Sequence, residues 1–274
     1  MDAERSRRYL DVMGVPVWRL RSADADTPGP EQGPEAVAPL ACQGDVMASD
    51  PVDLADAGVE LSPEATPDAV PAAGIAGADW ERLSEAVSSC RACELCATRT
   101  QTVFGEGNRR ADLMIVGEAP GADEDRQGEP FVGRAGQLLN LMLAAIGLER
   151  EQVFIANILK CRPPGNRDPR SEETLRCEPY LMRQIALVHP RVLLSVGRIS
   201  AQKLLRTDVP IGKLRGRWFT FGPDDIPMTV TYHPAYLLRS PEQKSKAWQD
   251  LLKVTRRLRG TAGKPGVEAA GRSV

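Results

Sequence analysis

The sequence predicts an α/β fold of three layers, in which helices cover both faces of a mostly parallel central sheet. Two observations lead to this prediction. Short apolar runs alternate along the chain with longer segments in which apolar residues recur every three or four positions. The first pattern is typical of buried parallel strands, and the second is typical of helices that lie against a sheet.

The expected elements follow one another in order. Residues 112–116 form a short apolar run before a glycine, which predicts a buried strand, and the helical spacing over 138–146 ends at another glycine. Asp168 and Pro169 are residue types favoured at the start of a helix. Further strands are expected over 153–158, 191–196, 218–221 and 228–232, and further helices over 168–188, 199–205 and 242–258.

The aromatic residues indicate how the 274 residues are divided into parts. No Phe, Tyr or Trp occurs between Trp18 and Trp80, where Pro and Gly are frequent. Such a stretch buries too little apolar surface to offset the entropy lost on ordering. We therefore expect a short motif over residues 1–21, a disordered acidic linker rich in Pro and Gly over 22–79, a folded domain over 80–259 and a flexible tail over 260–274.

The short motif contains an apolar patch between Tyr9 and Trp18. One interpretation is a terminal segment that frays or docks on its own domain. The other is a linear motif that binds a partner protein. The sequence leaves both interpretations open.

Charge is distributed unevenly along the chain. Residues 1–79 carry five arginines, no lysine and fifteen acidic side chains, a formal charge of −10, whereas the remaining residues carry +8. An acidic arm joined to a basic domain is a pattern found in proteins that bind nucleic acids, although a mildly basic domain is also common in other soluble proteins.

Several classes of protein are not expected from this sequence. No apolar run is long enough to span a bilayer, and the first residues lack the apolar segment of a secretory signal. Six cysteines in such a chain favour metal ligation over disulfides. We therefore expect a cytoplasmic protein rather than a membrane protein, a secreted disulfide scaffold or a coiled coil.

Three polar motifs lie where predicted strands end: the segment 117–121 with Glu118, then Asn157, then His233. In open α/β sheets, ligands bind outside the carboxyl ends of the strands, so these motifs are expected to share one pocket. Asn157 stands in an apolar strand, where an amide needs a partner because its burial is costly. Taken singly, a glutamate at a strand end or an isolated histidine is more often structural.

The cysteines suggest a metal centre. Cys90 and Cys93 form a C-x2-C pair, Cys161 follows the second predicted strand, and Cys177 lies on the next helix. Four thiolates can hold either a zinc ion or a [4Fe–4S] cluster, and spacing alone does not separate the two. Cys96 forms a second C-x2-C pair with Cys93, so the choice of four ligands from five also stays open.

Taken together and in this order, the motifs resemble those of the family-4 uracil-DNA glycosylases, the iron–sulfur branch of the uracil-DNA glycosylase superfamily. The resemblance covers about residues 83–254, nearly the whole predicted domain. The segments that carry it are Cys90–Cys93, Thr98–Thr100, Phe104–Asn108, Gly117–Gly121, Gly128–Gly136, Asn157–Arg167 and His233–Ala235.

The resemblance implies a fold, an activity and a cofactor. The fold would be that of a uracil-DNA glycosylase. The activity would be a step of base excision repair: uracil is flipped out of single- or double-stranded DNA and its N-glycosidic bond is hydrolysed, leaving an abasic site. The cofactor would be a [4Fe–4S] cluster held by Cys90, Cys93, Cys161 and Cys177. We expect the enzyme to be a monomer associated with the nucleoid.

The resemblance also implies roles for individual residues. Glu118 would act on water and on the charged sugar, and His233 would stabilise the departing uracil. Where the family-1 enzymes have an aspartate and a thymine-excluding tyrosine, this chain has Ala119 and Gly121, so Glu124 becomes the candidate for excluding thymine. The expected base-binding residues are Gly117, Ala119, Gly121, Glu124, Phe131 and Asn157.

DNA contacts are expected from basic residues in the motif loops and from the segment after His233, which resembles a loop that wedges into the minor groove. Each cation has an alternative interpretation as an ordinary solvated side chain. The expected DNA-binding residues are Arg134, Arg162, Arg167, Arg215, Leu237 and Arg239, with Lys160 and Lys213 as further cations.

Three other functions remain as alternatives at this point. The first is a non-catalytic iron–sulfur protein that binds DNA or assists a polymerase. The second is a glycosylase of a sister branch with a different base preference. The third is a zinc-stabilised hydrolase that acts on another substrate. Converging Glu118, Asn157 and His233 side chains would argue against the first, because binding alone does not need them together.

Overall fold

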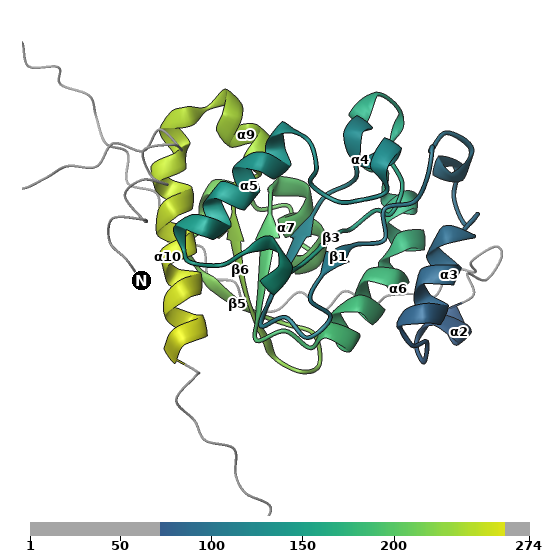
Figure 1. The fold of residues 1–274 in the computed structure, drawn as a ribbon, viewed down its shortest axis with the longest axis horizontal. Helices are drawn as coiled ribbons and strands as arrows, with labels where there is room; N and C mark the ends of the chain where they lie inside the picture. The colour runs from purple at the N-terminus through teal and green to yellow at the C-terminus, as the bar shows by residue number, and fades with distance from the viewer. Residues whose placement is uncertain (1–71, 261–274) are drawn as a thin grey trace, which may run out of the picture. The chain divides into compact units, whose positions relative to one another are not determined.

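Six strands form the central sheet of the computed structural model, which describes residues 72–260 (Figure 1). They lie in the order β1-β3-β2-β4-β6-β5. The inner pairs β3–β2, β2–β4 and β4–β6 are parallel, whereas the edge strands β1 and β5 pair antiparallel with their neighbours. The mostly parallel sheet is thus confirmed. The strands are β1 (Glu106–Gly107), β2 (Leu113–Gly117), β3 (Phe154–Asn157), β4 (Val192–Val196), β5 (Trp218–Phe221) and β6 (Ile226–Thr231).

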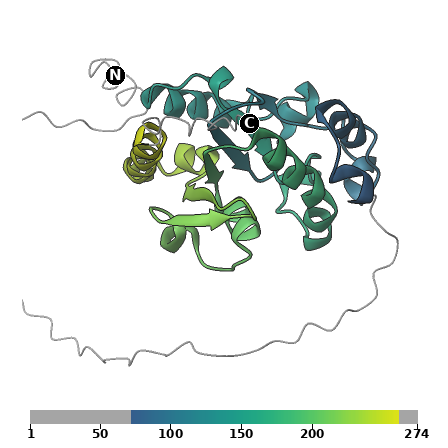
Figure 2. The ribbon, with the colours of Figure 1, turned by 90° about the horizontal axis from the view of Figure 1, so that it is seen from below.

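Helices cover both faces of this sheet, as the two views together show (Figures 1 and 2). One face carries α3 (Trp80–Ser88), α6 (Ser171–Val188) and α7 (Arg198–Leu205). The other carries α5 (Arg134–Ala145), α9 (Pro234–Arg239) and α10 (Lys244–Gly260). The remaining short elements are α2 (Ala72–Ile75), η1 (Glu94–Ala97), α4 (Ala122–Gln127), η2 (Arg150–Gln152), η3 (Pro164–Asn166), α8 (Ile211–Leu214) and η4 (Pro241–Gln243).

The apolar strand sequences reflect burial on both faces. Along β2, Met114 and Val116 pack into the core under α6, while Leu113 and Ile115 pack into the core under α5. Because successive side chains point to opposite faces, a strand covered on both sides needs an apolar residue at every position. The near-continuous apolar runs in the sequence have this physical origin.

The folded part begins earlier than the sequence predicts. Ile75 and Ala78 are both 4% exposed, and Arg183 Nε of α6 donates a hydrogen bond of 2.6 Å to the carbonyl of Ala78. The linker predicted over 22–79 is therefore too long at its end, because two apolar side chains there have a place in the core. The motif predicted over 1–21 and the tail from 261 onward lie outside the described residues.

Helix α6 begins later than its sequence signals suggest. Asp168 does not cap it, since its carboxylate forms an ion pair with Arg198 at 2.6 Å. The cap comes instead from Glu173, whose side chain accepts the backbone N–H of Arg170 at 2.8 Å. The helix therefore starts at Ser171. None of the described helices is long and apolar enough to cross a membrane.

The edge strand β1 depends on a glycine, which yields a first prediction. Gly107 has φ 114°, and a Cβ at this position would collide with the carbonyl oxygen of Val153 on the neighbouring chain segment. Gly107→Ala should therefore lower the free energy of unfolding by about 1–3 kcal/mol, measured by urea denaturation. Gly212→Ala, where a Cβ would meet nothing within 4 Å, is the matched control and should leave stability unchanged or slightly raised. Equal effects of the two substitutions would contradict this account.

Candidate functional site

A cavity of about 740 Å³ opens at the carboxyl ends of β2, β3 and β6. Glu118 enters it directly after β2, Asn157 is the last residue of β3, and His233 follows β6 by two residues. The sheet thus brings together the three polar motifs that the sequence singled out. The parallel register pairs Gly117 with Asn157, which sets the depth of the cavity floor.

Most of the expected base-binding residues lie on this cavity. Gly117 lies beneath it rather than on it: a Cβ there would collide with Asn157 Oδ1 and with the ring of Phe131. A glycine is required at this position because the amide and the ring both occupy the space of a side chain. The other predicted residues that line the cavity are Ala119, Gly121, Glu124, Phe131, Arg167 and Arg239.

The amide of Asn157 is buried without a full set of partners. The residue is 2% exposed, and its Oδ1 accepts no hydrogen bond from the described residues. An orphaned buried acceptor costs about 1–3 kcal/mol, so such an atom calls for an explanation. Since Asn157 lines the cavity, a ligand with an N–H group in the cavity would satisfy this oxygen.

His233 is held as a neutral hydrogen-bond donor. Its Nδ1 accepts the backbone N–H of Ala235 at 3.1 Å, which leaves the proton of the neutral ring on Nε2. Burial lowers the pKa of His233 to about 4, and the charge of Arg239 contributes in the same direction. The imidazole is therefore uncharged at neutral pH and offers one N–H.

Phe131 packs beside this imidazole in an unusual backbone conformation. The two ring centroids are 5.5 Å apart with an interplanar angle of 30°. Phe131 has φ 55°, in the left-handed region that non-glycine residues rarely adopt. Such conformations persist only where the surroundings hold them, and they concentrate at functional sites.

Glu118 is the acidic residue of the cavity whose pKa is shifted. Burial, with a smaller contribution from the charge of the nearby Asp168, raises its pKa to about 7, and Arg198 acts in the opposite direction. A carboxyl with this pKa exchanges its proton readily near neutral pH, which suits a general base.

Glu124 joins two loops beside the cavity through its carboxylate. Its Oε2 accepts the N–H of Gly121 at 3.0 Å, and its Oε1 accepts the N–H groups of Val132 and Gly133 at 3.1 and 3.3 Å. The carboxylate thus ties the loop after β2 to the loop that carries Phe131. Its oxygens face backbone amides, although the residue also lines the cavity.

A separate small cavity gathers sulfur ligands. Its walls include Cys90, Cys93, Cys161 and Cys177, and also Cys96. Within residues 72–260, no three His, Cys, Asp or Glu side chains are spaced to hold a single metal ion. A tetrahedral zinc site needs such compact spacing, whereas the cysteines of a four-iron cluster each bind a different iron and stand further apart.

The hydrogen bonds around these cysteines suit thiolates. Arg99 Nη1 donates to Cys161 Sγ at 3.1 Å, and the backbone N–H of Lys160 donates to Cys177 Sγ at 3.3 Å. Arg99 also donates to the carbonyl of Cys90 at 2.8 Å and so joins two separate cysteine segments. Sulfur donors that accept N–H groups fit an iron–sulfur cluster or a zinc ion and do not suit a hard cation such as Mg²⁺ or Ca²⁺.

Comparisons with known proteins agree with this geometry. Residues 104–252 match the family model described as the uracil DNA glycosylase superfamily. The type-4 uracil-DNA glycosylase of Sulfurisphaera tokodaii is 44% identical over 181 residues, which cover 64% of this chain and 82% of that protein. The type-4 enzyme of Archaeoglobus fulgidus is 43% identical over 174 residues, which cover 61% and 87%. The chain belongs to the type-4 family of the uracil DNA glycosylase superfamily.

A sister branch is less similar. The type-5 uracil-DNA glycosylase of Mycobacterium tuberculosis is 32% identical over 169 residues, which cover 49% of this chain and 62% of that protein. The type-4 resemblance inferred from the motifs is therefore confirmed, and the sister-branch alternative is disfavoured.

The cations expected at DNA in this type-4 family member differ in their surroundings. Arg134 and Arg239 are exposed. Arg162 Nε donates to Asn166 Oδ1 at 2.7 Å, and Arg167 forms an ion pair of 2.5 Å with Glu173. Arg162 and Arg167 are half-buried, and both oxygens of Glu173 already accept from Arg167. Arg167 and Arg239 line the cavity itself.

Two other expected cations are buried in structural interactions. Arg215 forms an ion pair of 3.1 Å with Asp250, whose side chain is only 1% exposed. Lys160 is 2% exposed and donates to the carbonyl of Asn157 at 2.9 Å and to Gln184 Oε1 at 2.6 Å. Their positions in motif loops suggested phosphate contacts, but buried partners occupy both charges.

The residue expected to wedge into DNA, Leu237, does not lie at the surface. Leu237 is 1% exposed and packs into the core under α5, because the segment after His233 forms the helix α9. The helix presents its neighbours instead: Tyr236 is 36% exposed and Leu238 is 37% exposed. Leu238 is therefore the exposed apolar side chain of this segment.

Sequence reasoning missed several residues of the cavity. Arg198 follows the end of β4, so the rule applied to the other strand ends would have found it. Asp168 was assigned to a helix cap, although its carboxylate pairs with Arg198. Asn166, Tyr232 and Tyr236 also line the cavity; each stood within an expected motif or strand, but none was assigned a role.

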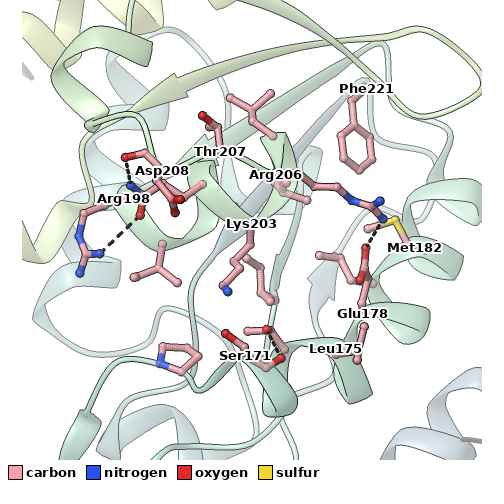
Figure 3. Close-up of a pocket in the computed structure, with 18 of the residues that line it drawn as sticks. Ser171, Leu175, Glu178, Met182, Arg198, Lys203, Arg206, Thr207, Asp208 and Phe221 are labelled. Carbon is pink, nitrogen blue, oxygen red and sulfur yellow. Dashed lines mark hydrogen bonds and ion pairs between the residues drawn. The ribbon is translucent and has the colours of Figure 1, made fainter. Parts of the chain in front are cut away.

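A larger cavity, of about 880 Å³, lies between α6 and α7 and is drawn in Figure 3. Leu175, Met182 and Phe221 contribute apolar walls. Its charges are largely matched, since Arg206 forms an ion pair with Glu178 at 3.4 Å. The groups with shifted pKa values, Glu118 and His233, lie on the smaller cavity, which is therefore the better candidate for chemistry.

Proposed function

We propose that this chain is a uracil-DNA glycosylase that hydrolyses the bond between uracil N1 and deoxyribose C1′ and leaves an abasic site in DNA. Membership of the type-4 family supports the activity. The observation that carries the proposal for this site is the unsatisfied Oδ1 of Asn157, buried beside Phe131 and His233. A planar base with an N–H edge matches these three side chains.

Recognition would begin once the base has left the duplex, because the target atom is unreachable within the stack. The flipped uracil would lie against the ring of Phe131. Asn157 Oδ1 would accept the N3–H of uracil, and the amide NH₂ would donate to O4. Cytosine presents an amino group at C4 and no proton at N3, so it would oppose both groups of the same amide.

Cleavage would place negative charge on the departing uracil. The Nε2–H of His233 would donate to uracil O2, an interaction that strengthens as the bond breaks and therefore accelerates the step. A neutral imidazole can do this without first losing a proton, because its pKa is about 4.

The sugar develops positive charge in the same step, and Glu118 would act on this side. Its carboxylate would stabilise the oxocarbenium-like sugar and accept a proton from the attacking water. The hydroxide part of water would join C1′, while uracil N1 would keep the electrons of the broken bond and later take up a proton. Exclusion of thymine by Glu124 remains our prediction, now acting through the loops that its carboxylate holds together.

We further propose that Cys90, Cys93, Cys161 and Cys177 hold a [4Fe–4S] cluster. Bound there, the cluster would act as a covalent brace between the segment that joins α3 to η1, the segment after β3 and α6. Hydrolysis transfers no electrons, so the cleavage step itself needs no change in the oxidation state of this brace. Cys96 lies on the same cavity and is the residue to test as a substitute ligand.

The substrate would be uracil-containing DNA, single- or double-stranded. Arg134, Arg162, Arg167 and Arg239 would neutralise phosphates around the cavity mouth. We propose a monomer that works in the cytoplasm at the nucleoid, with residues 1–21 as a site for a partner protein.

An excision assay tests the function. Oligonucleotides with one uracil should break after alkali treatment, whereas thymine controls should stay intact. Asn157→Ala and His233→Ala should each lower the single-turnover rate on the order of 10²-fold or more, because each removes an interaction with the base that matters in the transition state. Asn108→Ala, at an exposed turn outside the cavity, is the matched control and should keep the wild-type rate. Wild-type rates in both cavity variants would remove this mechanism.

The pH dependence tests the role of Glu118. Because the ionised carboxylate is the active form and its pKa is about 7, the single-turnover rate should rise about tenfold per pH unit below that value and level off above it. His233, with a pKa of about 4, should add no inflection between pH 5 and 9. Glu118→Gln should be slow and independent of pH over this range. The same inflection in that variant would assign it to another group.

Metal analysis tests the cofactor. Protein purified without oxygen should contain about four irons per chain and absorb visible light. Cys177→Ser should lose iron because a thiolate ligand is gone, whereas Cys96→Ser should keep it. A colourless wild-type protein that contains zinc would refute the cluster, and iron loss only in Cys96→Ser would refute the choice of ligands.

A further inference from the structure

Arg150, in η2, lies behind the backbone that carries Phe131. Its Nη2 donates to the carbonyl of Pro130 at 2.5 Å, and its Nη1 donates to the carbonyl of Phe131 at 3.3 Å. Arg150 is not among the residues that line the catalytic cavity. It touches the stacking residue only from behind, through the main chain.

The guanidinium is itself fixed in place. Arg150 Nε and Nη2 both donate to Glu106 Oε2, at 3.2 and 2.7 Å, and the side chain of Arg150 is only 17% exposed. Glu106 belongs to β1, where it pairs with Ile155, two residues before Asn157 on β3. Arg150 therefore connects the backbone of Phe131 to the strand that presents the amide.

The conformation of Phe131 needs such support. A phenylalanine in the left-handed region is strained and persists only if its neighbours hold it. Gly136 of α5 makes room for it, since a Cβ there would collide with the carbonyl of Phe131. Glu124 binds the next two N–H groups along the chain. Arg150 donates to the carbonyls of Pro130 and Phe131, so hydrogen bonds fix the main chain on both sides of the Phe131 side chain.

We propose that Arg150, braced by Glu106, is a positioning residue that holds Phe131 in this conformation and thereby sets the fit of the flipped base between the Phe131 ring and the Asn157 amide. This inference rests on the proposed glycosylase function. The wide, rigid guanidinium presents separate N–H groups to the two successive carbonyls and the carboxylate, whereas the compact ammonium of a lysine would reproduce this arrangement only in part.

The expected effect falls on catalysis by the bound complex. Misplacing a stacked group by about 1 Å can cost up to about 100-fold in rate. Arg150→Met should therefore lower the single-turnover rate at saturating protein on the order of 10- to 100-fold, and Arg150→Lys should recover only part of it. The affinity for uracil-free DNA should stay unchanged, since Arg150 acts on the flipped base. Arg109→Met is the matched control: Arg109 forms an exposed ion pair of 3.0 Å with Glu81, and this variant should keep the wild-type rate.

A double-mutant cycle separates positioning from general stability. If Arg150 acts through Phe131, then Arg150→Met should cause little further loss in a Phe131→Ala background, because the group that it positions is already gone. If Arg150 has only a structural role, the fold-losses in rate caused by Arg150→Met and by Phe131→Ala should multiply in the double variant. Thermal unfolding of every variant fixes an assay temperature at which all are folded. If Arg150→Met does not fold, Glu106→Gln enters the same cycle, with a smaller loss expected in the same direction.

The outcomes distinguish this inference from the function on which it rests. A wild-type protein that releases no uracil refutes the proposed function. A wild-type protein that excises uracil, together with an unchanged rate in Arg150→Met or with losses that multiply in the Phe131→Ala background, overturns the positioning role and leaves the function intact. A loss that disappears in that background supports the role.

Discussion

The site depends on the last residue pair between the parallel strands β2 and β3. Gly117 pairs there with Asn157, and the missing side chain of the glycine leaves space for both the amide oxygen and the Phe131 ring. Parallel pairing makes the two strands end together, so the polar residues that follow them open into one cavity. A shift of one residue in this register would turn the amide to the other face of the sheet.

Burial then gives the two titratable groups of the site opposite roles. It raises the pKa of Glu118 to about 7, which leaves a carboxyl able to exchange protons, and it lowers the pKa of His233 to about 4, which keeps the imidazole neutral. Both shifts disfavour the charged form, as burial always does. The Glu118 carboxyl can therefore accept a proton near neutral pH, and the neutral His233 ring can donate a hydrogen bond through Nε2.

The sequence allowed the strands to be predicted, and also the convergence of Glu118, Asn157 and His233 on one cavity, because buried parallel strands and strand-end pockets follow simple rules. The errors arose at side chains whose surroundings are set by residues distant in the sequence. Arg215 was expected at DNA but pairs with the buried Asp250, and Leu237 was expected as a wedge but faces the core of a short helix. Asp168 lost its role as a helix cap to Glu173. Arg150 could not have been found from sequence, since its contacts are with backbone carbonyls, which every residue has.

The two ends of the sheet have a consequence for solubility. An exposed strand edge can pair with another molecule and start aggregation. On one side the sheet ends in β1, which is only two residues long, and on the other it ends in β5, where Arg257 lies over the ring of Trp218. The edge at β1 is too short to template a second chain, and at β5 the guanidinium of Arg257 lies over an aromatic ring of the strand. Both features make these two edges poorer templates for pairing with another molecule.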